Sequence, residues 1–330
     1  MNRFAHVPRR NVIGFAIAAV IVAVLPLVLP PYFAFELGYA GAYAIGILGL
    51  IILTGMNGQI SLGHGAFMAV GGYTVAILAS RLGWPPEVAI LLAALLCAVF
   101  GALVGMVALR LSDAYLALAT FALAVSIPPL FKRFRDLTGG SQGISFSAAH
   151  APGPLGAIIN ASDWRYYEAW AIAGVIFIFT YFALRGRVGR ALRALRDSET
   201  AAISFGINPF VFKTLAFAWS AAYAGIAGAL IASATAFVSP DTYSLQLSMT
   251  LLIGAVLGGL GSLWGAVIGG LVVEFLPLWA QSVNTAASSL VYGISLIIVM
   301  IAMPGGLAAG IRRAAASLTR SRTKSQPERN

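Results

Sequence analysis

Long apolar blocks separated by short polar segments dominate the pattern of this chain. A helix of about 20 apolar residues crosses the hydrocarbon core of a bilayer. Because backbone N–H and C=O groups in lipid must be paired within their own segment, such blocks favour helices. The pattern therefore predicts an all-α protein that crosses a membrane many times. Eight blocks each have a length suited to one helix: residues 12–30, 39–54, 62–80, 88–109, 114–130, 169–184, 213–235 and 288–303.

A ninth apolar block, residues 247–280, is too long for a single crossing. Its middle reads Gly-Gly-Leu-Gly-Ser at 258–262, and glycine clusters interrupt regular structure. We therefore predict a short helix over 247–259 and a second over 264–280, which makes about ten membrane helices with short or broken segments. The first block follows a basic segment, as in a signal peptide. It is long and no clear small-residue cleavage site follows it, so we interpret it as a retained helix.

The positions of the 21 lysines and arginines predict the orientation, because basic loops favour the cytoplasmic side. With ten helices and the N-terminus inside, sixteen of the 21 basic residues fall on the inside, whereas nine helices divide them almost equally. We therefore predict two cytoplasmic tails, at 1–11 and 304–330, around a single membrane domain at 12–303. Residues 131–168 form its longest external loop and residues 185–212 a cytoplasmic loop.

Composition excludes several classes of protein. Hydrophobic residues make up 59% of the chain and charged residues only 10%, whereas soluble domains carry about 25% charged residues. The pI of about 10.1 comes from basic loops and tails between apolar blocks, which argues against nucleic-acid binding. The chain contains no HExxH or GxxxxGK(S/T) motif. We therefore predict no catalytic residue, no metal and no cofactor bound by this chain, so that any use of ATP falls to a partner.

Polar side chains stand beside glycines in the predicted cytoplasmic turn after the second helix. Asn57, Gln59, Ser61 and His64 are candidates for lining a pathway through the membrane domain. The alternative is a polar turn that satisfies its own backbone, and for His64 we favour that interpretation.

Two further residues, Thr120 and Glu274, are candidates for the pathway or its gating. A charge at the bilayer centre costs roughly 2.5–3.5 kcal/mol on insertion scales. Glu274 should therefore face protein or a wet cavity, or else reach the outer interface from the end of its helix. Proton-coupled pumps usually contain a chain of carboxylates at membrane depth, so a single carboxylate disfavours proton coupling.

The cytoplasmic loop at 185–212 carries five arginines followed by acidic and small residues. Residues 189–204 are good helix formers, and Gly206 or the pair Asn208-Pro209 would end such a helix. The segment is thus predicted to form a short cytoplasmic helix between two membrane helices. Two roles stay open for it: docking of a cytoplasmic partner, or an orientation-setting basic loop against anionic membrane lipid.

Several motifs in this chain resemble those of a known family. Residues 199–206 (ETAAISFG) resemble the loop by which permease subunits of ABC importers dock into their ATPase, although Thr200 interrupts the usual Glu-Ala-Ala. Other segments resemble the branched-chain amino-acid permeases of that class, over about residues 39–303. They are NGQISLGHGAF at 57–67, YLALAT at 115–120, LTGGSQG at 137–143 and GGLGSLWG at 258–265. The Thr-Gly-Gly stretch points to the LivM-type subunit rather than its LivH-type partner.

The resemblance implies a permease of vitamin-B12-importer-like architecture in a bacterial inner membrane. Besides membrane lipid, it implies three kinds of partner: a second, LivH-type permease; two ATP-binding subunits, which would hold ATP and magnesium; and a periplasmic substrate-binding protein. Coupling to the ATPase would involve Arg196, Glu199, Ala201, Ala202 and Gly206. Docking of the binding protein would involve Thr138, Gly139, Gly140 and Gln142.

Leucine, isoleucine and valine are the substrates that the resemblance favours. The motifs are weak for substrate because relatives carry urea, amides or aromatic acids, so these stay alternatives. A stand-alone secondary transporter or channel is another alternative; it would work without an ATPase and usually carries more charge within the membrane. A membrane-embedded enzyme would need paired catalytic residues at membrane depth, and the sequence shows none.

Overall fold

Helices make up most of the structure, a computed structural model that describes residues 20–108, 113–147, 160–283, 288–302 and 306–310. Seven of the helices in these ranges are long and apolar enough to cross a membrane. The prediction of an all-α, polytopic membrane protein is confirmed. The seven are α2 (Pro31–Leu50), α3 (His64–Leu82), α4 (Pro86–Ala108), α5 (Asp113–Arg133), α7 (Ala161–Arg185), α10 (Pro209–Thr235) and α12 (Leu263–Val283).

Two shorter apolar helices, α11 (Leu245–Gly258) and α13 (Ser288–Ala302), complete the described membrane region. The predicted division of the block at 247–280 is confirmed, because α11 ends at Gly258 and α12 begins at Leu263. Gly259 between them has a φ of 109°, which residues with a Cβ rarely adopt. Residues 20–28 are also helical, whereas the start of the first predicted helix and both predicted tails, apart from 306–310, lie outside the described residues.

Two membrane helices are longer than predicted. α2 and α7 each begin eight residues before the start that the apolar pattern indicates. Because α7 begins at Ala161 and α5 continues to Arg133, the segment predicted to be external is shorter than 131–168. The earlier starts bring Glu36, Arg165 and Glu168 into helices. Arg165 has a partner within the protein there, because its Nη1 donates to the carbonyl of Ala234 at 2.5 Å. The single carboxylate considered in the sequence, Glu274, is thus joined by other charged residues within the helices.

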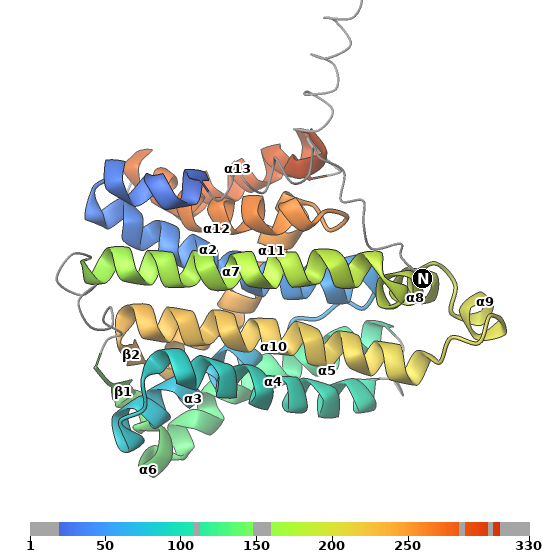
Figure 1. The fold of residues 1–330 in the computed structure, drawn as a ribbon, viewed down its shortest axis with the longest axis horizontal. Helices are drawn as coiled ribbons and strands as arrows, with labels where there is room; N and C mark the ends of the chain where they lie inside the picture. Colours follow the sequence, from blue (N-terminus) through green and yellow to red (C-terminus); the bar gives the residue numbers. More distant parts are fainter. Residues whose placement is uncertain (1–19, 109–112, 148–159, 284–287, 303–305, 311–330) are drawn as a thin grey trace, which may run out of the picture.

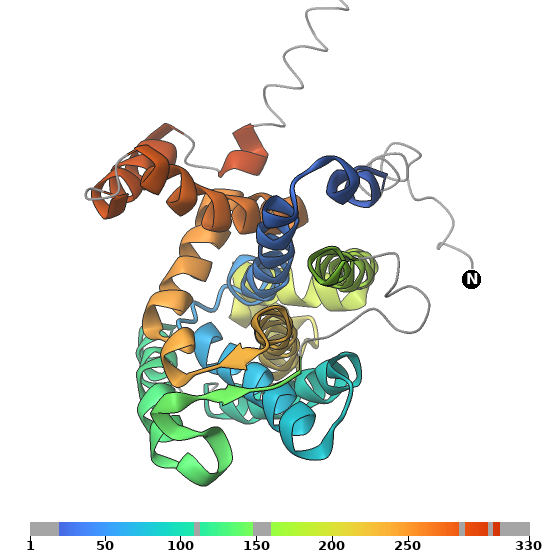
Figure 2. The same cartoon turned by 90° about the vertical axis from the view of Figure 1, so that its left-hand side faces the viewer.

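Burial differs strongly among the long helices. An 18-residue window of α2, taken with its continuation to Met56, is 83% buried, and one of α10 is 72% buried. The corresponding window of α5 is only 22% buried, so this helix presents most of its apolar surface outward. Figure 2, which views the molecule along the long helices, shows α10 surrounded by other helices. α2 and α10 therefore form the core, and α5 lies at the edge.

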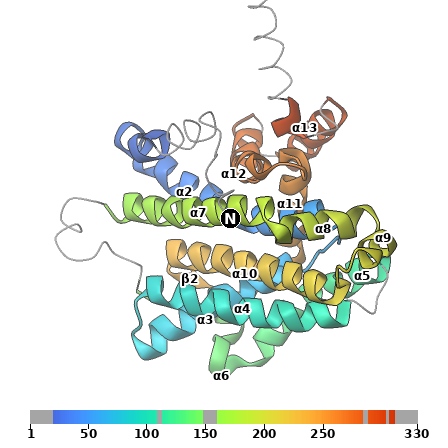
Figure 3. The ribbon, with the colours of Figure 1, turned by 45° about the vertical axis from the view of Figure 1, so that its right-hand side comes forward.

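The remaining elements are arranged around α7 and α10 (Figure 1). α3, α4 and α5 lie on one side and α12 and α13 on the other, while α11 packs against both α12 and α3. The two ends of the bundle differ. At one end, strand β1 (Ile144–Ser145) pairs antiparallel with β2 (Phe237–Val238). At the opposite end, α8 (Arg187–Asp197) and α9 (Glu199–Ser204) extend beyond the long helices (Figure 3).

Glycines bring the backbones of α3 and α10 into direct contact. A Cβ added to Gly71 would overlap the carbonyl of Gly225, and one added to Gly228 would overlap the carbonyl of Met68. Membrane helices gain van der Waals contact in this way, since small residues allow close approach. The α3–α10 contact therefore depends on the absence of side chains at these positions.

We expect Gly71→Val to destabilise the protein by about 1–3 kcal/mol, because the added methyl groups must push α3 away from α10. Gly174→Val is the matched control, since nothing lies within 4 Å of a Cβ at Gly174 on α7. Thermal unfolding in detergent measures both variants. Equal unfolding midpoints for the two would contradict the close packing of α3 and α10.

Candidate functional site

The cytoplasmic loop folds into two short helices instead of the single predicted one. α8 ends at Asp197, and the extended Ser198 (φ −162°, ψ 111°) separates it from α9. The Ser198 hydroxyl caps α9 by accepting a hydrogen bond from the Ala201 amide at 3.3 Å. α9 ends before Gly206, whose φ of 78° explains the glycine there. We call α8 and α9 together the cytoplasmic element, because the basic loop that contains them is predicted to lie on the cytoplasmic side.

The residues predicted to couple to an ATPase differ in where they point. Ala201 is exposed, whereas Ala202 is only 2% exposed and packs inward. Glu199 is half-exposed and forms an ion pair with Lys213 of α10 at 2.6 Å, so it braces the loop. The side chain of Ala202 thus fills the interior of this chain, and a part in coupling to an ATPase stays a prediction for both alanines. Gly206 is exposed, and a Cβ there would meet nothing within 4 Å.

Exposed apolar residues at the tip of the cytoplasmic element were missed in the sequence. Phe205 is 87% exposed and Ile203 is 54% exposed, at the end of the molecule farthest from β1 and β2. The sequence carries a weak signal for them, because Ile203 and Phe205 follow the polar stretch Asp197–Thr200. An apolar tip on a charged element is a feature of interaction surfaces.

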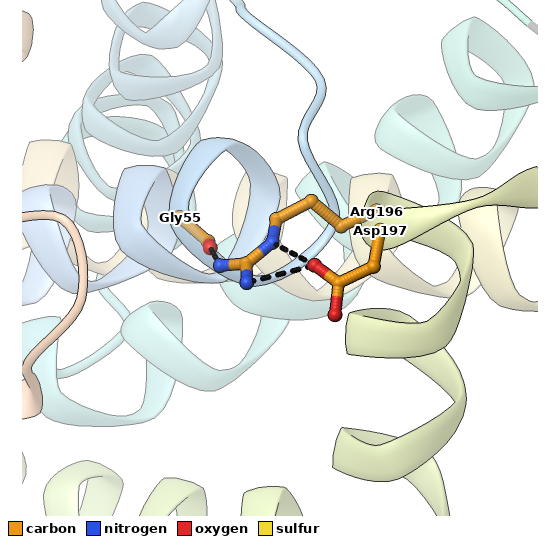
Figure 4. A network of polar contacts seen from close by, with 3 residues as sticks. All are labelled: Gly55, Arg196 and Asp197. Atoms are coloured by element: carbon orange, nitrogen blue, oxygen red, sulfur yellow. Dashed lines mark hydrogen bonds and ion pairs between the residues drawn. The ribbon is translucent and has the colours of Figure 1, made fainter.

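Arg196 points toward the membrane core rather than away from it (Figure 4). Its Nη1 donates to the carbonyl of Gly55 at 2.7 Å. Its Nε and Nη2 donate to Oδ1 of Asp197 at 3.1 and 3.0 Å. The guanidinium is thus held between the end of its own helix and the end of the segment that continues α2.

That segment is η1 (Ile51–Met56), a stretch of π-helix. Short π-helical stretches are rare and occur frequently at functional sites. η1 ends in a polar turn at residues 57–63, where the Gln59 amide donates to the Leu53 carbonyl at 3.1 Å and the Thr54 hydroxyl to the Gln59 carbonyl at 3.0 Å. The carbonyl of Gly55 lies at this helix end, where carbonyls need partners from outside the helix.

The polar turn contains three of the predicted pathway residues, and all three are buried. Asn57 and Gln59 are each 3% exposed and bond to each other through Nδ2 and Oε1 at 2.5 Å. The Ser61 hydroxyl accepts from the Gly63 amide at 3.2 Å. Among the described residues, Oδ1 of Asn57 has no partner. These bonds agree with a turn that satisfies its own backbone, while a role in lining a pathway stays a prediction.

Thr120 connects the polar turn to α5. Its hydroxyl accepts from the Leu62 amide at 3.0 Å and donates to the carbonyls of Leu116 and Ala117 at 3.1 and 3.0 Å. Thr120 also lines an apolar groove of about 300 Å³ between α4 and α5. The structure thus brings this candidate together with the turn. The other lining residues are Leu103, Val104, Val107, Leu116, Ala119 and Leu123.

His64 lies in the packed interior at the start of α3. Its Nε2 lies 2.8 Å from the hydroxyl of Ser220, which donates to the carbonyl of Gly49 at 2.7 Å. Because the Ser220 proton is used in that bond, the His64 Nε2–H donates to Ser220. The next residue, Gly65, donates from its amide to the Ser248 hydroxyl at 2.8 Å. His64 therefore joins α2, α3 and α10 through a distant side chain rather than satisfying its own turn, and a role in a pathway stays a prediction.

Glu274 lies apart from the polar turn. It is half-buried on α12 and its carboxyl interacts with that of Glu36 near the start of α2. The polar turn follows the end of η1, more than 20 residues beyond Glu36 along the same helical axis. At a rise of about 1.5 Å per residue, the two sites are on the order of 30 Å apart. Glu274 thus faces protein, and any role in a pathway stays a prediction.

The candidates for docking a binding protein divide into buried and exposed residues. Thr138 is 3% exposed, and its hydroxyl donates to the carbonyls of Phe131 and Phe134 at 2.5 and 2.8 Å. Gly140 is also buried, whereas Gly139 and Gln142 are exposed. Thr138 and Gly140 therefore shape the turn that leads into β1, and Gln142 is the side chain that the turn presents.

A network of contacts not foreseen from the sequence holds this end together. Lys132 of α5 forms an ion pair with Asp241 at 2.6 Å, and Arg81 of α3 donates to the carbonyl of Asp136.

Among the described residues, no three His, Cys, Asp or Glu side chains gather as a metal site would require.

Replacing Thr120 by valine should lower stability by about 1–3 kcal/mol, because the Leu62 amide loses its acceptor within a protein interior. Thr120→Ser, which keeps the hydroxyl, is the control. Thermal unfolding in detergent distinguishes them, and a valine variant as stable as the serine variant would show that the bond between turn and α5 contributes nothing.

Comparison with known proteins gives a consistent relationship. A family model described as branched-chain amino acid transport system / permease component matches residues 32–300. The chain is 32% identical over 286 residues to the high-affinity branched-chain amino acid transport system permease protein LivM of Escherichia coli K12, covering 80% of this chain and 67% of that protein. No solved structure matches the chain.

Two further relatives are more distant. The corresponding LivH protein of Escherichia coli K12 is 27% identical over 283 residues, which is 80% of this chain and 90% of that protein. A probable LivM permease of Methanocaldococcus jannaschii is 23% identical over 305 residues, or 82% and 87% of the two chains. The higher identity to LivM of Escherichia coli agrees with the prediction made from the Thr-Gly-Gly stretch. The chain belongs to the family of branched-chain amino acid transport permeases and is a transport component rather than an enzyme.

Proposed function

We propose that this chain is one membrane subunit of an ATP-driven importer of leucine, isoleucine and valine. One observation carries the proposal: this chain, a member of the permease family, has a cytoplasmic element with an exposed apolar tip at one end of the bundle. An apolar, exposed tip suits docking into a partner protein. Because the chain contains no phosphate-binding GxxxxGK(S/T) loop, ATP binding and hydrolysis belong to that partner.

Further partners follow from the same arrangement. Similarity to both LivM and LivH supports pairing with a second, related permease. The sparsely buried, apolar α5 supplies a surface for such a pairing. A substrate-binding protein would dock at the opposite end, where Gln142 is exposed. The basic residues of the cytoplasmic element support an inner-membrane orientation with that element and both termini in the cytoplasm.

The transport step requires two states that bind substrate differently, since a ligand drives an equilibrium only through its differential affinity. In the proposed mechanism, the ATPase moves the cytoplasmic element and the helices follow between outward- and inward-facing arrangements. Urea, amides and aromatic acids stay alternative substrates of the same mechanism.

The complex captured through a tag on this chain should contain two ATPase subunits. In liposomes that are supplied with its binding protein, the complex should take up leucine, isoleucine and valine only when ATP is present. The chain purified alone should not hydrolyse ATP, because it lacks a phosphate-binding loop. Radiolabelled uptake measures both substrate and energy source. Uptake of urea without any amino acid would refute the substrate, and uptake by the chain alone without ATP would refute the importer class.

Phe205→Asp should reduce copurification of the ATPase by about tenfold or more, because a charge replaces an exposed apolar side chain at the proposed contact. Phe237→Asp is the matched control, since Phe237 is also exposed but lies on β2 at the opposite end. Quantitative pull-down measures the two. Full ATPase recovery with Phe205→Asp would place the docking surface elsewhere.

A further inference from the structure

The hydrogen bond from Arg196 to Gly55 joins the cytoplasmic element to the membrane core across 141 positions of sequence (Figure 4). The two bonds to Asp197 fix the plane of the guanidinium. With that plane fixed, Nη1 is aimed at the carbonyl of Gly55. A bond from a charged donor is stronger than one between neutral groups. The end of α8 is therefore held at one defined point of η1.

η1 is packed on a second side by the turn between α11 and α12. A Cβ added to Gly55 would overlap the carbonyl of Leu260, so these two backbones are in direct contact. The π-helical end of α2 thus lies between α8 and that turn. Displacement of η1 therefore affects both neighbours at once.

The stem of Arg196 also packs against the polar turn. Gly58 has a φ of 80°, and a Cβ there would lie 2.9 Å from Cγ of Arg196. Four residues further, the Leu62 amide bonds to the Thr120 hydroxyl on α5. A continuous series of contacts thus runs from α8 through η1 and the polar turn to α5. Of the seven long helices, α5 is the least buried.

We propose that Arg196 is a positioning residue that fastens α8 to η1 and to the polar turn, so that movement of the cytoplasmic element reaches α5. The inference rests on the proposed function, because it concerns how that function is driven. It also assigns Arg196 a role inside this chain. Each of its three guanidinium nitrogens donates one bond to Gly55 or Asp197, so Arg196 acts as an internal fastening, and we place the contact with a partner at the exposed tip around Phe205.

Arg196→Gln should leave ATPase copurification and ATP hydrolysis near the wild-type level. Uptake should fall by about tenfold, because the variant loses one charge-assisted hydrogen bond. Arg187→Gln is the matched control, since Arg187 is an exposed arginine at the other end of α8. A merely structural role would lower protein yield and ATPase binding together with uptake. Arg196→Lys, which keeps a charged donor on a long stem, should restore part of the uptake.

A disulfide provides an independent test in a Cys97→Ala background, which removes the chain's one cysteine. A Cβ at Gly58 would lie 3.6 Å from Cβ of Arg196, within the range of about 3.5–4.5 Å that a disulfide requires. The double variant Gly58→Cys with Arg196→Cys should resemble Arg196→Gln when reduced. Oxidation should restore uptake, because the bond replaces the lost fastening, and a reducing agent should reverse it.

Each outcome decides between the two proposals. Full uptake by Arg196→Gln, or a disulfide that forms without restoring uptake, would overturn the role of Arg196 while the importer stands. Gly58→Cys alone could abolish uptake, because cysteine is strained at a φ of 80°. In that case Arg196→Lys is compared with Arg196→Met, and an equal loss of uptake in both variants overturns the inference. No ATP-driven uptake by the wild-type complex would refute the proposed function itself.

Discussion

The need to pair every backbone polar group within an apolar medium governs this structure. Inside a helix the pairing is automatic, but each helix end in the interior needs other partners. At the end of α2, Arg196 meets the carbonyl of Gly55. Just beyond it, Thr120 accepts from the Leu62 amide, and Ser248 accepts from Gly65 at the start of α3. The polar side chains near these turns are therefore explained first by backbone pairing, and a function in transport is built on that framework.

The same constraint concentrates polar chemistry at a few places and leaves the rest to close packing. Glycines on α3 and α10 bring the two backbones into direct contact, beside the hydrogen bond between His64 and Ser220. α2, α3 and α10 thereby form a tight core, while α5 is less buried and contacts the bundle through one stripe of residues that includes Thr120, Ala124 and Ile127. A rigid core with a loosely packed neighbour is the arrangement that a lever-driven transporter requires, since only part of the bundle has to move.

The two ends of the molecule are built differently. At one end, β1 pairs with β2, and Lys132 pairs with Asp241, so the segment predicted to be external is tied down at several points. At the other end, the cytoplasmic element is held by Arg196 and by the ion pair of Glu199 with Lys213, while Phe205 stays exposed. Buried Leu192 and Leu195 anchor α8 as well, so this end combines polar contacts with apolar packing beneath an exposed tip.

The sequence alone was sufficient to predict the class of protein, the positions of most membrane helices and the break at 258–262. These features could be predicted because apolar blocks and glycine clusters are local properties of the chain. It misjudged the starts of α2 and α7, since Glu36 and Arg165 look like loop residues until their partners are known. Only the tertiary structure decided that Ala202 faces inward and that Arg196 reaches Gly55. These contacts join segments far apart in the chain, and no local pattern encodes which distant carbonyl a given side chain meets.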